Sequence, residues 1–129
     1  MFTIAQIKDA HSQVKSGADF PGYIRAIKQL GVTGYQTFVT DGHTDYTGGD
    51  NYQISSDAKY SALEIAPVSD KAEFETYLRA HQQGQSDYLT FCQQSADTGV
   101  EKWVVDLAAM TCTYYDLAGN VMLEEKIPG

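Results

Sequence analysis

Three side chains capable of metal binding and acid–base chemistry occupy alternate positions in Asp41-Gly42-His43-Thr44-Asp45-Tyr46. Residues two apart on a β-strand share one face, so Asp41, His43 and Asp45 could converge on one divalent metal ion. Three mixed ligands would leave a coordination position open for catalysis. The alternative is that Asp41-Gly42 forms a turn while His43 and Asp45 line a solvated sheet edge, and the sequence favours this turn.

The other histidines and both cysteines have structural explanations. His11 and His81 fall near the ends of two expected helices, where a cation meets the negative end of the helix dipole. A paired site formed by these two histidines is the alternative. Cys92 lacks sequence neighbours that would lower a thiol pKa, and Cys112 lies in an expected strand. Without a multi-cysteine framework, both thiols are expected to be reduced and buried.

Aromatic residues give the strongest functional indication. The chain has nine tyrosines, five phenylalanines and one tryptophan, and many of them fall in expected strands. Such rings commonly pack across the strands of a half-buried sheet. The alternative is that some of them line a ligand groove or a protein interface. The resulting ligand or interface candidates are Tyr35, Trp103, Tyr46, Tyr114 and His81.

The composition predicts one acidic, cytoplasmic domain. Hydrophobic residues make up 43% and charged residues 20%, which suits a chain that folds on its own. The net charge is −8 and the nine basic residues are spread along the chain, so nucleic acid and anionic membranes are unsuitable partners. Residues 1–4 begin neither a basic nor a continuous apolar leader, and no apolar run has the length of a membrane span.

Common catalytic signatures are absent from the sequence. It contains no phosphate-cradling glycine loop ending in Lys-Ser or Lys-Thr, no GxGxxG after a strand, no HExxH, no GxSxG and no paired CxxC. Nucleotide, zinc-protease and serine-hydrolase mechanisms therefore lose support. We expect no cofactor, and a non-enzymatic protein rather than an enzyme.

Hydrophobic periodicity predicts four helices in two consecutive pairs. The first helix, over residues 3–15, begins with a capping box formed by Thr3 and Gln6. Each helix is expected to end at a glycine that adopts the left-handed conformation. These glycines are Gly17, Gly31, Gly84 and Gly99.

After each helix pair the hydrophobic period changes to two, which predicts strands. In the first strand Tyr35, Thr37 and Val39 should face one side and Phe38 the other. The glycines of Gly48-Gly49-Asp50-Asn51 are expected to supply the positive φ of a hairpin turn. The expected strands are 32–40, 43–47, 52–55, 60–66, 100–107, 111–115 and 121–127.

The order of elements repeats along the chain, at an offset of 68 residues. This offset superimposes a helix start, a helix stop and two strand aromatics on residues of the same role. The superimposed pairs are Asp19 and Asp87, Gly31 and Gly99, Tyr35 and Trp103, and Tyr46 and Tyr114. The sequence thus predicts an α+β domain over residues 1–129 with two pseudo-symmetric helix-helix-β units, approximately 3–66 and 69–127, whose helices pack on an antiparallel sheet.

Seven motifs extend over most of the chain. They are Asp19-Phe20-Pro21-Gly22-Tyr23, residues 30–35, Asp41-Gly42-His43-Thr44, Ala80-His81-Gln82-Gln83-Gly84, residues 87–92, residues 99–106 and residues 110–116. With these motifs the chain resembles the YbcV/YdfO-like family of small bacterial and prophage proteins. The resemblance implies a compact α+β domain of the YdfO-like fold, and it implies no activity and no catalytic residues.

These observations predict a non-enzymatic binding or protein-interaction module. A protein partner or self-association as a homodimer is expected, and a small-molecule ligand stays open. The alternative is a small metal-binding protein or enzyme that uses Asp41, His43 and Asp45. The position of the largest pocket would separate the two, because a seam between the units without a pocket lined by Tyr35, Trp103 and a histidine favours an interface over an enzyme.

Overall fold

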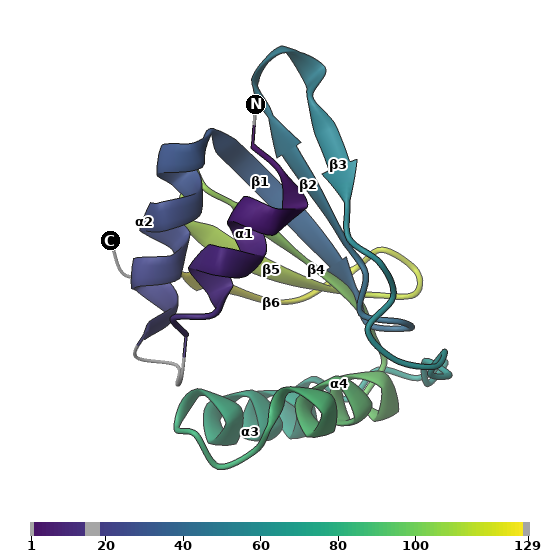
Figure 1. Cartoon of the computed structure of the whole chain (residues 1–129). Coiled ribbons are helices and arrows are strands. Elements are labelled where there is room, and N and C mark those ends of the chain that lie inside the picture. The colour runs from purple at the N-terminus through teal and green to yellow at the C-terminus, as the bar shows by residue number, and fades with distance from the viewer. Residues whose placement is uncertain (1, 15–18, 128–129) are drawn as a thin grey trace.

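One antiparallel sheet carries the helices of this α+β protein (Figure 1). A computed structural model describes residues 2–14 and 19–127 of the chain. In this described part, no helix combines the length and the apolar character needed to cross a bilayer. The helices are α1 (Ile4–His11), α2 (Phe20–Leu30), α3 (Lys71–Gln82) and α4 (Tyr88–Asp97), and the strands are β1 (Val32–Phe38), β2 (Thr44–Gly48), β3 (Gln53–Ser55), β4 (Val100–Asp106), β5 (Thr111–Asp116) and β6 (Val121–Lys126).

The strands lie in the order β3-β2-β1-β4-β5-β6, and every neighbouring pair is antiparallel. The central pair, β1 and β4, joins the N-terminal half of the chain to the C-terminal half. Tyr35 of β1 lies opposite Tyr46 of β2, and Trp103 of β4 lies opposite Tyr114 of β5. The predicted α+β class and antiparallel sheet are confirmed.

The helices pack on one face of the sheet. The hydroxyl of Tyr23 in α2 approaches that of Tyr46, and the ring of Phe91 in α4 lies 5.8 Å from that of Trp103. Cross-strand pairing places Tyr46 and Trp103 on the same face as Tyr35. The two helix pairs therefore cover different parts of a single face, as Figure 1 shows.

The alternation predicted for β1 is confirmed. Tyr35, Thr37 and Val39 are buried under the helices, whereas Phe38 points to the opposite side and is half-buried. We call this opposite side the helix-free face. An antiparallel sheet tolerates such a face because its polar side chains can stay in water.

The helix ends follow their capping residues. The backbone N–H of Gln6 donates to Thr3 Oγ1 at 3.2 Å and the N–H of Thr3 donates to Gln6 Oε1 at 2.9 Å, so the predicted capping box is confirmed. Helix α1 ends at His11, earlier than expected, and the predicted stop at Gly17 lies outside the described residues. Gly31 closes α2 at φ +105°, as expected.

The strand predicted over residues 60–66 is wrong. This segment lies outside the six-stranded sheet, in which β1 is flanked by β2 and β4. It instead makes single hydrogen bonds to the ends of other elements. The N–H of Leu63 donates to the carbonyl of Thr40 at 2.6 Å, and that of Ala66 to the carbonyl of Ala96 at 2.9 Å.

The turn between β2 and β3 is present, but its glycines do not supply the positive φ. Asp50 and Asn51 do so, at φ 58° and 62°, and short polar side chains tolerate this region. Gly48 has a different reason to lack a side chain. A Cβ at this position would lie 2.6 Å from the ring of Phe2, so the glycine permits a close approach.

Two glycines with similar backbone angles should differ sharply in their tolerance of alanine. At Gly99 (φ +90°) a Cβ would lie 2.8 Å from the Cα of Ser69, whereas at Gly84 (φ +77°) nothing lies within 4 Å. We expect Gly99→Ala to lower the free energy of unfolding by about 3 kcal/mol or more, since a backbone clash adds to the strain. Gly84→Ala should lower it by about 1 kcal/mol. Urea unfolding measures both, and equal losses would contradict this packing.

Candidate functional site

Four of the residues predicted as ligand or interface candidates meet on the helix-covered face. Tyr46, Tyr35, Trp103 and Tyr114 come from the neighbouring strands β2, β1, β4 and β5. The ring centroids of Tyr35 and Tyr46 are 5.5 Å apart, and those of Trp103 and Tyr114 are 6.0 Å apart. These are ordinary separations for interacting aromatic rings. We call these four rings the aromatic seam, because they lie where the areas covered by the two helix pairs meet.

The four residues of the aromatic seam belong to the buried hydrophobic core. Tyr35 is 8% exposed, Tyr46 and Trp103 are 9% exposed and Tyr114 is 7% exposed. The seam is therefore a cluster of aromatic rings inside the core, between the sheet and the helices.

Phenol hydroxyls add polar chemistry at the β2 end of the seam. The hydroxyls of Tyr23 and Tyr46 approach each other, which places a polar contact between α2 and the sheet. Burial is the main cause that raises the pKa of both phenols above the ordinary value. Both hydroxyls therefore keep their protons at neutral pH and act as hydrogen-bonding groups rather than as bases.

Cys92 lies beneath two further phenols. The hydroxyls of Tyr60 and Tyr88 approach its sulfur, and burial raises the pKa of this thiol. Tyr88 is 40% exposed even though its hydroxyl is close to the fully buried Cys92, because the side chain extends from the surface into the core. Burial also raises the pKa of Cys112 to about 12. Both cysteines are free and buried, as predicted.

Both flanking histidines pack against aromatic rings. His81 stacks on Phe91 at 4.4 Å between ring centroids, and His11 meets Tyr23 edge-on at 5.2 Å. Burial is the main cause that lowers the pKa of each histidine. Desolvation thus outweighs the helix dipole that was expected to favour their charged form. His81 contacts the seam indirectly, because it stacks on Phe91, whose ring packs near that of Trp103.

The predicted metal cluster lies at the turn before β2. His43 Nδ1 is 2.5 Å from Asp41 Oδ1, while His43 Nε2 is 3.9 Å from Asp45 Oδ1. Asp45 also accepts a hydrogen bond from Ser55 Oγ at 2.6 Å. The three side chains meet, but the two ring nitrogens face different carboxylates. Among residues 2–14 and 19–127, no group of three or more His, Cys, Asp or Glu side chains is placed to hold a metal ion.

The helix-free face carries a row of side chains that the sequence did not predict as a group. His43 stacks on Phe38 at 4.6 Å between centroids, and Lys102 Nζ lies 5.7 Å from the Phe38 ring and 5.8 Å from that of Tyr115. Lys102 also donates to Gln36 Oε1 at 3.2 Å. The alternation of β1 had placed Phe38 on this side. The row itself depends on the register between strands from different halves of the chain.

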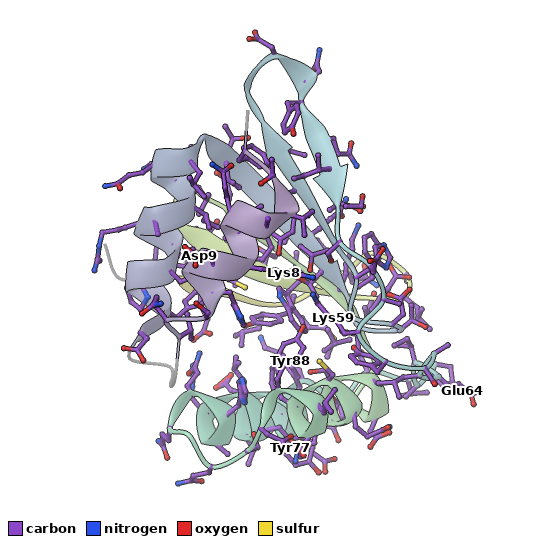
Figure 2. All side chains as sticks on the ribbon, in the orientation of Figure 1. Lys8, Asp9, Lys59, Glu64, Tyr77 and Tyr88 are labelled. Atoms are coloured by element: carbon purple, nitrogen blue, oxygen red, sulfur yellow. The ribbon has the colours of Figure 1, made fainter. Side chains whose placement is uncertain are left out.

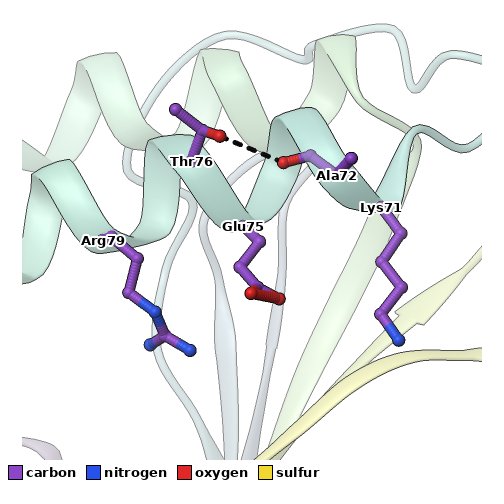
Figure 3. A pocket seen from close by; sticks show the side chains of 5 residues that line it. All are labelled: Lys71, Ala72, Glu75, Thr76 and Arg79. Atoms are coloured by element: carbon purple, nitrogen blue, oxygen red, sulfur yellow. Dashed lines mark hydrogen bonds between the residues drawn. The ribbon is translucent and has the colours of Figure 1, made fainter.

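Two surface hollows lie away from the four rings. One, of about 540 Å³, lies beside α3, where Lys71, Glu75 and Arg79 point to one side of the helix (Figure 3). Arg79 is also ion-paired with Glu125 of β6. The other, of about 360 Å³, is lined by parts of α1 and α2 that include Tyr23. Neither hollow is lined by Tyr35, Trp103 or a histidine.

Fold and site together define a small α+β domain whose helix-covered sheet has a buried aromatic centre. Residues 8–126 match the model of a family described as "Protein of unknown function (DUF1398)". The chain belongs to this family. An uncharacterised family agrees with the prediction from the sequence, and the YbcV/YdfO-like name stays a prediction.

Curated relatives come from mycobacteria. They include "Uncharacterized protein Mb2035" of Mycobacterium bovis and "Uncharacterized protein MT2067" and "Uncharacterized protein Rv2012" of Mycobacterium tuberculosis. Each is 38% identical to this chain over 58 residues, which are 45% of this chain and 35% of the relative. The similarity thus extends over about a third of each relative.

The turn before β2 should respond to acid through Asp41. The backbone N–H of His43, which donates to Asp41 Oδ1 at 3.0 Å, is the main cause that lowers the pKa of this carboxyl from 3.8. A lowered pKa stabilises the fold above the unfolded value, and this contribution is lost as pH falls through the folded value. Asp41→Asn should therefore show a smaller loss of stability below about pH 4 than the unchanged protein. Urea unfolding at several pH values measures the free energy of unfolding of both proteins. If this free energy falls equally steeply in both as the pH is lowered, the proposed role of Asp41 is wrong.

Proposed function

We propose that this protein is a non-enzymatic binding module and that the aromatic seam is its site for a small molecule. The observation that carries the proposal is the cluster of four aromatic rings that neighbouring strands place on one face of the sheet, Tyr35, Tyr46, Trp103 and Tyr114. Aromatic rings offer apolar surface to a ligand, and most small-molecule sites combine such surface with a few polar groups. Here Tyr23 and Tyr46 supply those polar groups.

The chemistry of the nearby residues supports binding without catalysis. Burial raises the pKa of Cys92 and Cys112, so their thiolates are scarce at neutral pH. Burial lowers the pKa of His81, whose Nδ1 is 3.1 Å from the carbonyl oxygen of Ser86 and 3.2 Å from its hydroxyl oxygen. An activated cysteine needs a base within hydrogen-bond reach, and the groups close to the sulfur of Cys92 are the phenols of Tyr60 and Tyr88.

We further propose that the seam lies between two copies of one unit, residues 3–66 and 69–127. At an offset of 68 the pair Tyr35–Tyr46 corresponds to Trp103–Tyr114. The register shift after Val32 in β1 likewise corresponds to the shift after Val100 in β4. The outer strands β3 and β6 correspond at an offset of 69, with Ile54 opposite Tyr46 and Leu123 opposite Tyr114. Equivalent bulges support a common origin, because bulges are positioned features of a sheet.

Trp103, the only tryptophan of the chain, reports directly on the site. We expect a saturable change in its fluorescence with at least one of methyl benzoate, methyl 4-hydroxybenzoate and methyl cinnamate. Tyr35→Leu should weaken that binding at least about tenfold, because it removes a ring from the seam. Tyr115→Leu is the matched control on the helix-free face and should bind normally. If none of the three probes gives a saturable response, or if both variants bind the probe equally weakly, the proposal is wrong.

Self-association through the helix-free face is a second candidate function. Val121, which is 59% exposed, lies opposite Tyr115 there and adds apolar surface to the row of Phe38 and Lys102. We propose that a second copy of the chain binds this face. Charges of both signs alternate on this part of the face, so a two-fold symmetric dimer could place opposite charges against each other. The charged residues are Lys102, Lys126, Asp106 and Glu124.

Sedimentation at rising protein concentration tests this second candidate. We expect a dimer that Val121→Lys weakens at least about tenfold, since a charge would be buried at the contact. Leu89→Lys is the matched control, because Leu89 is 58% exposed on α4, on the other side of the sheet. A strictly monomeric protein at high concentration would rule this candidate out.

A further inference from the structure

We infer that a second copy of the chain binds along the free edge of β6, so that two sheets join into one through antiparallel β6–β6 pairing. This contact goes beyond both proposed functions, because it uses an edge of the sheet and neither of its faces. The edge strands are β3, with three residues, and β6, with six. The longer edge offers more unpaired backbone groups to another strand, so β6 is the edge that can be extended.

Glu124 and Lys126 direct their backbone groups away from the sheet. The N–H of Ile127 donates toward β5, to the carbonyl of Met110, at 2.8 Å. In an antiparallel pair, successive residues point their N–H and C=O groups alternately toward the partner strand and away from it. Among residues 2–14 and 19–127, no group hydrogen-bonds to the outward backbone groups of Glu124 and Lys126.

The regular part of this edge is symmetric about Glu125. At one end a register shift against β5 leaves Met122 without an opposite residue, as in a bulge. At the other end residue 128 is a proline, which has no N–H to donate. Residues 123–127 lie between these two positions, and Glu125 is at their centre. A two-fold axis at Glu125 therefore uses the whole regular stretch of both copies.

The charges of β6 match across this axis. Each copy sets its Glu124 opposite Lys126 of the other, and both side chains are exposed. Opposite charges that face each other across an antiparallel pair attract, and the symmetry forms this pair twice. A slide of two residues would set Glu124 opposite its own copy, where like charges repel. The charges therefore select one register.

Glu125 meets its own copy at the axis, and Arg79 offsets this like-charge contact. Arg79 of α3 is ion-paired with Glu125, and Gln82 Nε2 donates to the same carboxylate at 2.9 Å. Helix α3 lies on the helix-covered face, since the ring centroid of Phe74 is 4.9 Å from that of Tyr114. It thus neutralises Glu125 from that face and leaves the outward backbone groups of β6 unbonded.

Hydrogen exchange of single amides, followed by nuclear magnetic resonance, measures the edge contact directly. We use the full chain with Val121→Lys, which breaks the contact through the helix-free face. At high protein concentration we expect residual association that slows exchange of the amides of Glu124 and Lys126 about threefold or more. The matched control is the amide of Ser55, which points outward on β3 because the next N–H, of Ser56, donates to Thr44 of β2. Its exchange should not change with concentration.

Charge reversals in the same background test the register. Glu124→Lys and Lys126→Glu should each weaken the association at least about fivefold, because each sets like charges opposite each other twice. The double variant restores opposite charges and should associate normally. Glu64→Lys, at an exposed residue between β3 and α3, is the charge-matched control and should have no effect.

Three results would overturn the inference. They are amides of Glu124 and Lys126 whose exchange does not depend on concentration, a double variant that associates no better than the single ones, and a strictly monomeric Val121→Lys protein. A strictly monomeric Val121→Lys protein beside a dimeric unchanged chain would leave the contact through the helix-free face standing, so the two contacts can fail separately.

Discussion

The antiparallel pairing of β1 with β4 is the interaction on which the rest of this structure depends. It joins the two halves of the chain, and its register sets Thr37 opposite Trp103 and Tyr35 opposite Val105. A shift by one residue would turn every side chain of one strand to the other face of the sheet. The aromatic seam therefore exists because this one pairing places rings from both halves on the helix-covered side.

The sequence allowed the local structure to be predicted wherever one segment determines it. The capping box at Thr3 and the alternation around Phe38 need only their own neighbours in the chain, and both are confirmed. Residues 60–66 have the composition of a strand but lie outside the six-stranded sheet, which no local pattern reveals. The turn at Asp50 and Asn51 likewise depends on Gly48, whose place is set by Phe2 from the start of the chain.

The sequence allowed the residues of the candidate site to be predicted, but not how they are arranged. The tyrosines and Trp103 were chosen by residue type and strand position, and cross-strand pairing brings them together. His81 was expected to be a cation, whereas burial against Phe91 lowers its pKa.

The two faces of the sheet offer different chemistry, and this difference separates the two proposed functions. The helix-covered face has buried aromatic rings and protonated phenols, whereas the helix-free face has the row of Phe38, Lys102 and Tyr115. Chemical-shift mapping by nuclear magnetic resonance with methyl cinnamate distinguishes the two faces most directly. The structure predicts that the largest shifts occur at the indole N–H of Trp103 and at the amide of Tyr35. Shifts confined to the helix-free face would contradict the aromatic seam as the binding site.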